Sequence, residues 1–322
     1  MVGIPIVYGS SGVCINCRMQ IQISDSHFIA FFSGCEMYCR GCNCIFNLGK
    51  VVTNSIIKDI NYYKSRVANL LGACEKHVSI SVEPEKYSII YPNDIGIDKH
   101  CTILNISINA EGDNAAHPIL SLGQHPSEIS LNDEIMIYGM SYGKPSLRNS
   151  KTTVIISFIP NPNNLNWLRN ISQGIRAYAD GTFRDAAPIL VTGLEELSFL
   201  TINKLLGDSG INKVTKLGWS TIFNVILPLL ADRNDVPRLS EELTKAAKDL
   251  YSVRNTCVHE GKYPKNFDES LAPKLACDSI LVSRYLDLLG KGWLVKPEHR
   301  NDYVNKLGSF LGVHNPHNSP FQ

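Results

Sequence analysis

Three polar residues on one predicted helix have side chains suited to proton transfer and to binding a phosphate. In the stretch "DLYSVRNTCVHEGKYP", Arg254, Asn255 and His259 lie among apolar residues at helical spacing, and Gly261 ends the pattern. A histidine takes up or releases a proton near neutral pH, and an arginine is a permanent cation with a planar fork of N–H donors. Asn255 and His259 are four residues apart, so we expect the amide to orient the imidazole. A base beside an arginine is sufficient for attack of a ribose 2′-hydroxyl on the adjacent phosphate, a reaction that needs no metal.

A structural role is the alternative for the same residues. Arg254 can pair with Glu195 or Glu196 from a preceding predicted helix, and His259 can cap the C-terminal end of its own helix. Residue types and spacing leave both interpretations open.

Four cysteines form a second set of residues with chemical potential. Cys14 and Cys17 in "VCINC" and Cys39 and Cys42 in "CRGC" make two C-x-x-C pairs with 21 residues between them. Each pair can chelate from one tight turn, and we expect an intervening hairpin to bring the pairs together as in a zinc ribbon. A structural Zn²⁺ would also explain how a short segment with few core residues stays folded.

Part of the same segment has a second interpretation. The stretch "SGCEMYCRGCNC" resembles the iron–sulfur loop of radical S-adenosylmethionine enzymes, which implies a cluster on Cys35, Cys39 and Cys42. One predicted helix and then consecutive strands follow this loop, without a glycine-rich cofactor motif, so the surrounding sequence favours zinc. Replacement of one zinc ligand by Cys35, Cys44 or His27 stays open.

The stretch "RNTCVH" has the pattern R-N-x-x-x-H and resembles the signature of the HEPN family (higher eukaryotes and prokaryotes nucleotide-binding). The resemblance implies an all-helical bundle and a metal-independent endoribonuclease of the antiviral defence or toxin type, with Arg254, Asn255 and His259 as catalytic residues. It also implies a homodimer whose two motifs share one cleft. A non-catalytic adaptor or nucleotide-binding module of the same family is the alternative.

A basic stretch is the candidate for holding RNA. Between residues 144 and 184 there are six basic residues and one acid, interleaved with aromatic residues that include Trp167 and Tyr178, and such a stretch can follow a phosphate backbone. A solvated helix face with buried aromatic residues is the alternative. The six basic residues are Lys144, Arg148, Lys151, Arg169, Arg176 and Arg184.

The composition is that of an ordinary globular protein. Of 322 residues, 44% are hydrophobic and 19% are charged, and the formal net charge is +1. A charge so near zero excludes a general attraction to nucleic acid or to a membrane, so a polyanion must bind a local patch. No apolar run has the length of a membrane span, and the N-terminal sequence lacks the features of a signal peptide. We therefore expect a cytoplasmic protein whose ten cysteines are thiols or metal ligands.

The order of helix-like and strand-like patterns along the sequence predicts an α+β multidomain protein of three consecutive parts. Residues 1–52 would be the zinc ribbon, and residues 53–160 a helix from Asn54 to Cys74, capped by Asn54, followed by a β-rich domain. Residues 161–322 would be the helical bundle, including a helix that starts at Ser240. We expect RNA and a second copy of the chain as partners of the bundle, and a regulatory protein or ligand at the sensor domains before it.

Overall fold

The computed structural model describes residues 7–58, 67–97, 101–111, 115–120, 134–142, 147–159, 166–207 and 217–314. Its contacts divide the chain into two compact units. Unit 1 combines Met1–Leu71 with Trp167–Gln322, and unit 2 is Gly72–Asn166. This division differs from the three consecutive parts expected from the sequence, because the cysteine-rich segment packs against C-terminal helices within one unit.

The N-terminal part of unit 1 contains short antiparallel strand pairs and helices. Its first two strands pair with each other, whereas its third strand pairs with a strand at the C-terminal end of the described chain. The elements are β1 (Val7–Val13), β2 (Gln20–Ser24), α1 (Asp25–Phe32), β3 (Tyr38–Cys39), α2 (Leu48–Lys58), α4 (Val67–Leu70) and the C-terminal strand β10 (Val313–His314).

The expected Asn54 cap is wrong, because α2 begins at Leu48 and Asn54 lies inside it. The side chain of Asn47 caps the helix instead: its Oδ1 accepts a hydrogen bond of 3.0 Å from the backbone N–H of Lys50. The expected continuation from residue 59 to residue 66 lies outside the described residues, and β-structure begins at Cys74.

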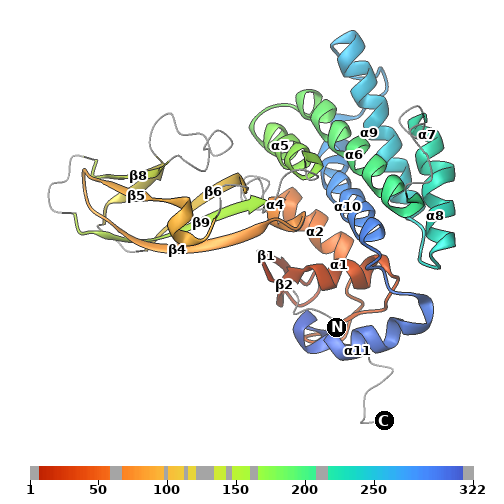
Figure 1. Ribbon diagram of the computed structural model, residues 1–322, viewed down its shortest axis with the longest axis horizontal. Helices are drawn as coiled ribbons and strands as arrows, with labels where there is room; N and C mark the ends of the chain where they lie inside the picture. The colour runs from red at the N-terminus through yellow and green to blue at the C-terminus, as the bar shows by residue number, and fades with distance from the viewer. Residues whose placement is uncertain are drawn as a thin grey trace. The chain divides into compact units, whose positions relative to one another are not determined.

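The C-terminal part of unit 1 is helical (Figure 1), as the helical spacing of its apolar residues predicts. None of the described helices combines the length and apolarity needed to cross a membrane. The elements are α5 (Asn166–Asp180), α6 (Phe183–Leu206), α7 (Trp219–Thr221), the π-helical turn η5 (Ile222–Ile226), α8 (Leu227–Arg233), α9 (Glu241–Glu260), η6 (Glu269–Leu271), α10 (Ala272–Lys291), η7 (Pro297–His299) and α11 (Arg300–Leu311).

Helix α9 has the ends that its sequence predicts. The Ser240 hydroxyl accepts a hydrogen bond of 3.3 Å from the Leu243 N–H and caps the N-terminus. At the other end Gly261 has φ +65, and its N–H donates to the carbonyl of Cys257. Glycine adopts this left-handed conformation without steric cost, so the helix ends at Glu260, one residue after His259.

Helices α6, α9 and α10 pack against one another, and α10 also contacts α2 (Figure 1). Every residue from Leu275 to Gly290 on α10 is buried, so this helix forms the centre of unit 1. Helix α5 approaches α6 closely at two glycines: a Cβ on Gly174 would lie 2.5 Å from a methyl group of Leu190. A Cβ on Gly193 would likewise collide with Ile171.

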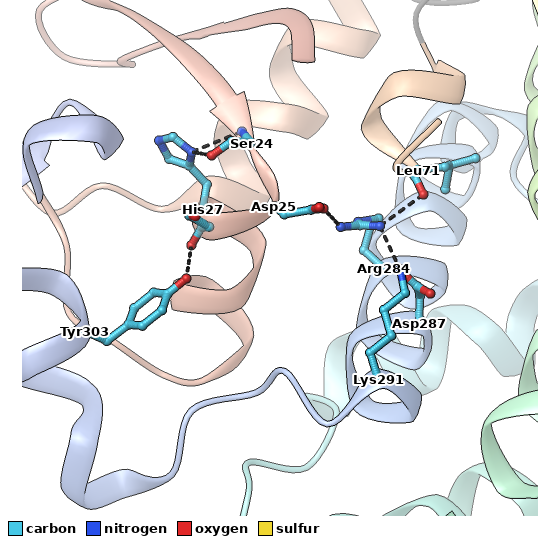
Figure 2. A network of polar contacts seen from close by, with 9 residues as sticks. Ser24, Asp25, His27, Leu71, Arg284, Asp287, Lys291 and Tyr303 are labelled. Atoms are coloured by element: carbon cyan, nitrogen blue, oxygen red, sulfur yellow. Dashed lines mark hydrogen bonds and ion pairs between the residues drawn. The ribbon is translucent and has the colours of Figure 1, made fainter. Parts of the chain in front are cut away.

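A buried arginine connects α10 to the N-terminal part of unit 1 (Figure 2). Arg284 has no exposed surface, and its guanidinium contacts the carboxylates of Asp25 on α1 and Asp287 on α10. Its Nη1 also donates a hydrogen bond of 3.0 Å to the carbonyl of Leu71, just after α4, and its Cζ lies 5.2 Å from the ring centroid of Phe28. A buried charge is tolerated when partners of this kind surround it.

The cysteine-rich segment also packs against α11 and the residues that flank it. The buried His27 donates from Nε2 to the carbonyl of Leu311 at 2.7 Å, and its Nδ1 accepts from the Ser24 N–H at 3.1 Å. The Ser33 hydroxyl accepts a hydrogen bond of 2.7 Å from the N–H of Val295. Segments almost three hundred residues apart in sequence are therefore parts of one core.

We expect His27 to make unit 1 acid-sensitive. Burial lowers the pKa of His27 to about 4, although the Leu311 carbonyl acts in the opposite direction. In the unfolded chain the pKa is about 6.5, so the unfolded state binds the proton first as the pH falls. The free energy of unfolding should therefore fall by about 3 kcal/mol between pH 6.5 and pH 4, and not change through His27 above that range.

Urea unfolding of the wild-type chain and of His27→Gln, measured at a series of pH values, checks this prediction. Acidic groups elsewhere titrate in both proteins, so the difference between the two curves isolates His27. Parallel curves from pH 6.5 to pH 4 would contradict the burial of a neutral imidazole.

Unit 2 consists of two three-stranded antiparallel sheets, in agreement with the β-rich domain predicted from the sequence. The sheets have the strand orders β4-β9-β6 and β5-β8-β7, and side chains from both contribute to one hydrophobic cluster that includes Val82, Ile137 and Ile156. The elements are β4 (Cys74–Val82), β5 (Tyr87–Ile90), η1 (Pro92–Ile95), β6 (Thr102–Glu111), β7 (His117–Leu120), β8 (Ile135–Met140) and β9 (Ser150–Ile159).

Candidate functional site

The four cysteines of the two C-x-x-C pairs come together in unit 1. The sulfur atoms of Cys14, Cys17, Cys39 and Cys42 all lie within 4.8 Å of one another. The Cys14–Cys42 distance is 3.8 Å and the Cys17–Cys39 distance is 3.6 Å. A tetrahedral site with Zn–S bonds of about 2.3 Å requires sulfur–sulfur distances of about 3.8 Å. The cluster therefore has the dimensions of a four-thiolate metal site.

The two pairs have the same backbone structure. The N–H of Cys14 donates to the carbonyl of Met19 and that of Cys39 to the carbonyl of Cys44, both at 2.9 Å. The residue after each pair adopts a left-handed conformation: Arg18 has φ 61 and Asn43 has φ 54. Two copies of one turn thus face each other across the cluster, and each presents two thiols.

Hydrogen bonds from backbone amides favour the thiolate form in both pairs, although burial and neighbouring thiols leave the pKa values of Cys17, Cys39 and Cys42 raised on balance. Burial raises the pKa of Cys14, but hydrogen bonds from the amides of Cys17 and Asn16 outweigh it and bring the pKa to about 7. In the second pair the N–H of Gly41 donates to Cys39 Sγ at 3.4 Å. A thiolate is the form that binds a metal, so this arrangement fits a cation at the centre of the cluster.

The expected hairpin between the pairs is wrong. A hairpin of β1 and β2 carries the first pair at its turn, and the residues between the pairs form β2 and α1. The second pair begins at Cys39, the last residue of β3, and β10 pairs with β3 in a two-stranded sheet. The cluster is therefore built into unit 1 and contacts its C-terminal strand.

None of the three substitute ligands belongs to the cluster that the described residues form. Burial raises the pKa of Cys35 to about 11, although the charge of Arg300 opposes this effect, and the thiol is not one of the four gathered sulfurs. Both ring nitrogens of His27 are hydrogen-bonded, and Cys44 is exposed. Because Cys39 and Cys42 face the first pair, Cys35 does not complete the iron–sulfur set that "SGCEMYCRGCNC" suggests.

Replacing Cys39 with serine should abolish metal binding by the cluster and loosen α11. Three thiolates hold a tetrahedral metal much more weakly than four, and β3 and β10 pair directly beside Cys39. The metal content by mass spectrometry should fall, and amide exchange should accelerate in α11. Cys44→Ser is the matched control and should retain both the metal and the slow exchange, since Cys44 lies outside the four-sulfur group. Unchanged metal content in Cys39→Ser would contradict the site.

Replacing Arg18 with glycine should stabilise the first turn. A left-handed conformation costs a residue with a Cβ about 1–2 kcal/mol, and Arg18 has φ 61. Glycine removes this strain but gains about 0.5–1 kcal/mol of freedom in the unfolded chain, so the net gain should be at most about 1.5 kcal/mol. The thermal midpoint of the metal-loaded protein measures it. Asn43→Gly should gain less, because it also loses a contact of 2.7 Å between Asn43 Oδ1 and His314 Nε2.

The second candidate site lies near the C-terminal end of α9. Arg254, Asn255, Val258 and His259 form one strip of the helix surface, beside the buried strip that includes Leu250 and Cys257. Arg254 and Asn255 are half-buried, His259 is exposed, and Val258 is 53% exposed. The structure thus places the three predicted residues on a rigid element with the imidazole in solvent.

The contacts of Arg254 bear on both interpretations of the motif, the catalytic one and the structural one. Its Nη1 donates a hydrogen bond of 2.8 Å to Asn255 Oδ1, and its Cζ lies 5.9 Å from the ring centroid of Tyr251. In the described chain Asn255 and His259 share no hydrogen bond, so the amide orients the arginine and not the imidazole. Burial raises the pKa of Glu195 on α6, and the charge of Arg254 partly offsets this effect. Glu195 is therefore the acidic neighbour of Arg254.

The six basic residues proposed to hold RNA do not form one surface within either unit. Lys144 lies outside the described residues, Arg148 and Lys151 are exposed in unit 2, and the others belong to unit 1. Arg169 is exposed and Arg176 half-buried, both on α5. The sixth, Arg184, is exposed at the start of α6.

Arg184 is the basic candidate that contacts the end of the motif helix. Its Nη1 donates a hydrogen bond of 3.3 Å to the carbonyl of Gly261, and its backbone N–H donates to the Tyr263 hydroxyl at 2.8 Å. The sequence signal that could have identified this contact is Tyr263 itself, an aromatic residue just after the helix-ending glycine. Arg184 therefore places a cation and the N-terminus of α6 close to the turn that follows His259.

Comparison with known proteins adds no relative. No protein-family model matches the chain, and searches of curated proteins and of solved structures return no significant match. The function must therefore be argued from the residues and contacts of the chain itself.

Proposed function

We propose that the chain is a metal-independent endoribonuclease of the HEPN type. The observation that carries the proposal is the placement of Arg254 and His259 on one strip of α9, with the guanidinium oriented by Asn255 and Tyr251. An arginine has five N–H donors, and the contact with Asn255 uses only one of its amine groups. The guanidinium therefore keeps donors for phosphate oxygens.

The proposed reaction is an internal transesterification. His259 removes the proton of the ribose 2′-hydroxyl, whose oxygen attacks the adjacent phosphorus, and the bond to the 5′-oxygen breaks. The leaving oxygen takes up a proton from water, and His259 returns the proton that it holds to the solvent. Arg254 stabilises the negative charge that develops on the phosphoryl oxygens. The products carry a 2′,3′-cyclic phosphate and a 5′-hydroxyl.

We propose that two copies of the chain meet through this strip of α9. Val258 lies within the strip and is 53% exposed, so it presents an apolar side chain on the same surface as Arg254 and His259. Dimer formation would cover it and bring two sets of Arg254 and His259 into one cleft. The resemblance to HEPN proteins implies the same arrangement.

We also propose that Zn²⁺ occupies the cysteine cluster and has a structural role. Four thiolates at tetrahedral distances leave no open position for a substrate or an activated water, and they suit zinc among the common divalent metals. The metal would hold the two turns together and so support β10 and α11.

Incubation of labelled RNA with the full chain in excess EDTA tests the proposed activity. Cleavage should persist, and the fragments should carry 2′,3′-cyclic phosphate ends. A parallel reaction with His259→Ala controls for contaminating nucleases. Dependence on added Mg²⁺, or 3′-hydroxyl products, would refute the mechanism. Specific RNA or nucleotide binding without cleavage would favour the non-catalytic adaptor instead.

A further inference from the structure

The β5-β8-β7 sheet of unit 2 has a largely apolar and aromatic surface on the side away from the core, with one imidazole, that of His117. Ile90, Ile135 and Ile137 point into the hydrophobic cluster, so the alternate side chains point outward. The strand register places these outward side chains next to one another across the sheet. The outer face, as we call this surface, consists of Tyr87, Ile89, Tyr91, His117, Ile119, Met136, Tyr138 and Met140.

Several residues of the outer face are more exposed than apolar side chains usually are. Tyr87 is 58% exposed, Ile89 44% and Tyr91 47%. The rings of Tyr87 and Tyr138 lie 5.0 Å apart and form a contiguous aromatic surface. Tyr142, 70% exposed, continues the surface just beyond β8. Scattered exposed apolar residues need no explanation, but a contiguous set on one sheet face indicates a binding surface.

A carboxylate lies at each end of the outer face. Glu85 accepts hydrogen bonds from the hydroxyls of Tyr138 and Ser141 and, at 3.1 Å, from the Ser141 N–H. These bonds hold the carboxylate in place at one end of β8. Glu134 precedes β8 at the other end, where it interacts with the hydroxyl of Tyr91. At about 3.4 Å per residue, the two ends of this stretch of β8 are separated by about 20 Å.

The charge of this sheet and its turns is negative. The described residues 83–97, 115–120 and 134–142 contain four carboxylates and a single lysine. That lysine, Lys86, pairs with Glu83 at 2.5 Å. A nucleic acid backbone would be repelled by such a surface, whereas a cationic ligand would be attracted to it.

We propose that the outer face is the docking site for a cationic segment of a protein partner. Apolar side chains in the middle of the segment would cover the tyrosines, and lysine or arginine residues at both ends would approach Glu85 and Glu134. A span of about 20 Å corresponds to about six residues of an extended chain. This inference concerns unit 2 alone and is independent of the proposed cleavage of RNA by unit 1.

Calorimetric titration of the full chain with the peptide Lys-Lys-Leu-Ser-Tyr-Ser-Leu-Lys-Lys tests the proposal. The peptide should bind, and a version with glutamate at every lysine should not. Tyr87→Ser should weaken binding at least tenfold, about what the loss of a central tyrosine costs an interface. Glu85→Gln should reduce both the affinity and its dependence on salt.

Leu229→Ser is the matched control, because Leu229 is 59% exposed on α8 of unit 1 and should not affect binding. Absence of binding at peptide concentrations up to about 1 mM would overturn the proposal, as would equal binding of the glutamate peptide. Tighter binding of an oligouridine that Tyr87→Ser abolishes would identify a nucleic-acid surface instead. Self-association of the chain that Tyr87→Ser abolishes would identify a second copy as the occupant. Either result would overturn the proposed partner.

Discussion

His259→Ala should lower the rate of RNA cleavage by about 10²- to 10⁴-fold, the usual contribution of a general acid or base. Arg254→Ala should lower it by about 10²- to 10³-fold, because it removes a donor to the charged transition state. Neither change should unfold the protein, since His259 is exposed and Arg254 is only half-buried. Single-turnover cleavage of labelled RNA, with circular dichroism of each variant, measures both effects.

His299→Ala is the matched control, because His299 is also an exposed histidine of unit 1. Asn255→Ala should lower the rate less than Arg254→Ala, and should not shift the pH profile, since its amide contacts the arginine and not the imidazole. A shifted pH profile would instead place Asn255 against His259 in the active form. Full cleavage by His259→Ala would exclude the mechanism.

Mixing the two inactive variants tests whether the site is shared. If each cleft takes Arg254 from one copy and His259 from the other, heterodimers of Arg254→Ala with His259→Ala should recover part of the activity. Recovery requires an exchange of subunits, which mass spectrometry of the mixture can verify. Complete absence of recovery in verified heterodimers would assign both residues of each site to the same copy.

Arg284→Met should destabilise unit 1 by about 3–5 kcal/mol, the usual cost of removing one partner from a buried ion pair. Arg284 is completely buried between Asp25 and Asp287, so both carboxylates would lose their cation (Figure 2). Lys291, 2.7 Å from Asp287, would compensate only one of them. Denaturant unfolding followed by the helical circular dichroism signal measures the change.

Arg238→Met is the control for this experiment. Arg238 pairs with Asp232 at 2.5 Å, but both side chains are largely exposed, so the unfolding midpoint should hardly move. Combining Arg284→Met with Asp25→Asn should cost less than the sum of the single changes, because the carboxylate left unpaired by the first change is gone. Equal midpoints for Arg284→Met and Arg238→Met would contradict a central role for the network.

The contacts of Arg284 also affect which fragments of the chain can fold on their own. A fragment of residues 161–322 would contain Arg284 without Asp25 or the Leu71 carbonyl, and α11 without its contact to His27. We therefore expect this fragment to fold poorly. Regulation by a separable domain is better tested on unit 2, whose hydrophobic cluster is formed by residues of its own sheets.

Sequence alone was sufficient where neighbouring residues decide the structure. The ends of α9 follow from a serine cap and a terminal glycine, and the alternating apolar residues of unit 2 predicted its antiparallel strands. The spacing of the two C-x-x-C pairs predicted a four-sulfur cluster, which the structure contains. Such features depend on hydrogen bonds and side-chain periods within a few residues, so a sequence pattern can reveal them.

Only the tertiary structure decided which distant segments lie together. It joins His27 to Leu311 and Arg284 to Asp25, and so merges the cysteine-rich segment with the helices that were expected to form another domain. It also directs the Asn255 amide to Arg254, because that guanidinium is held beside Tyr251, although the helical spacing suggested His259. Contacts of this kind depend on the packing of whole elements, and many alternative packings are compatible with the same local patterns.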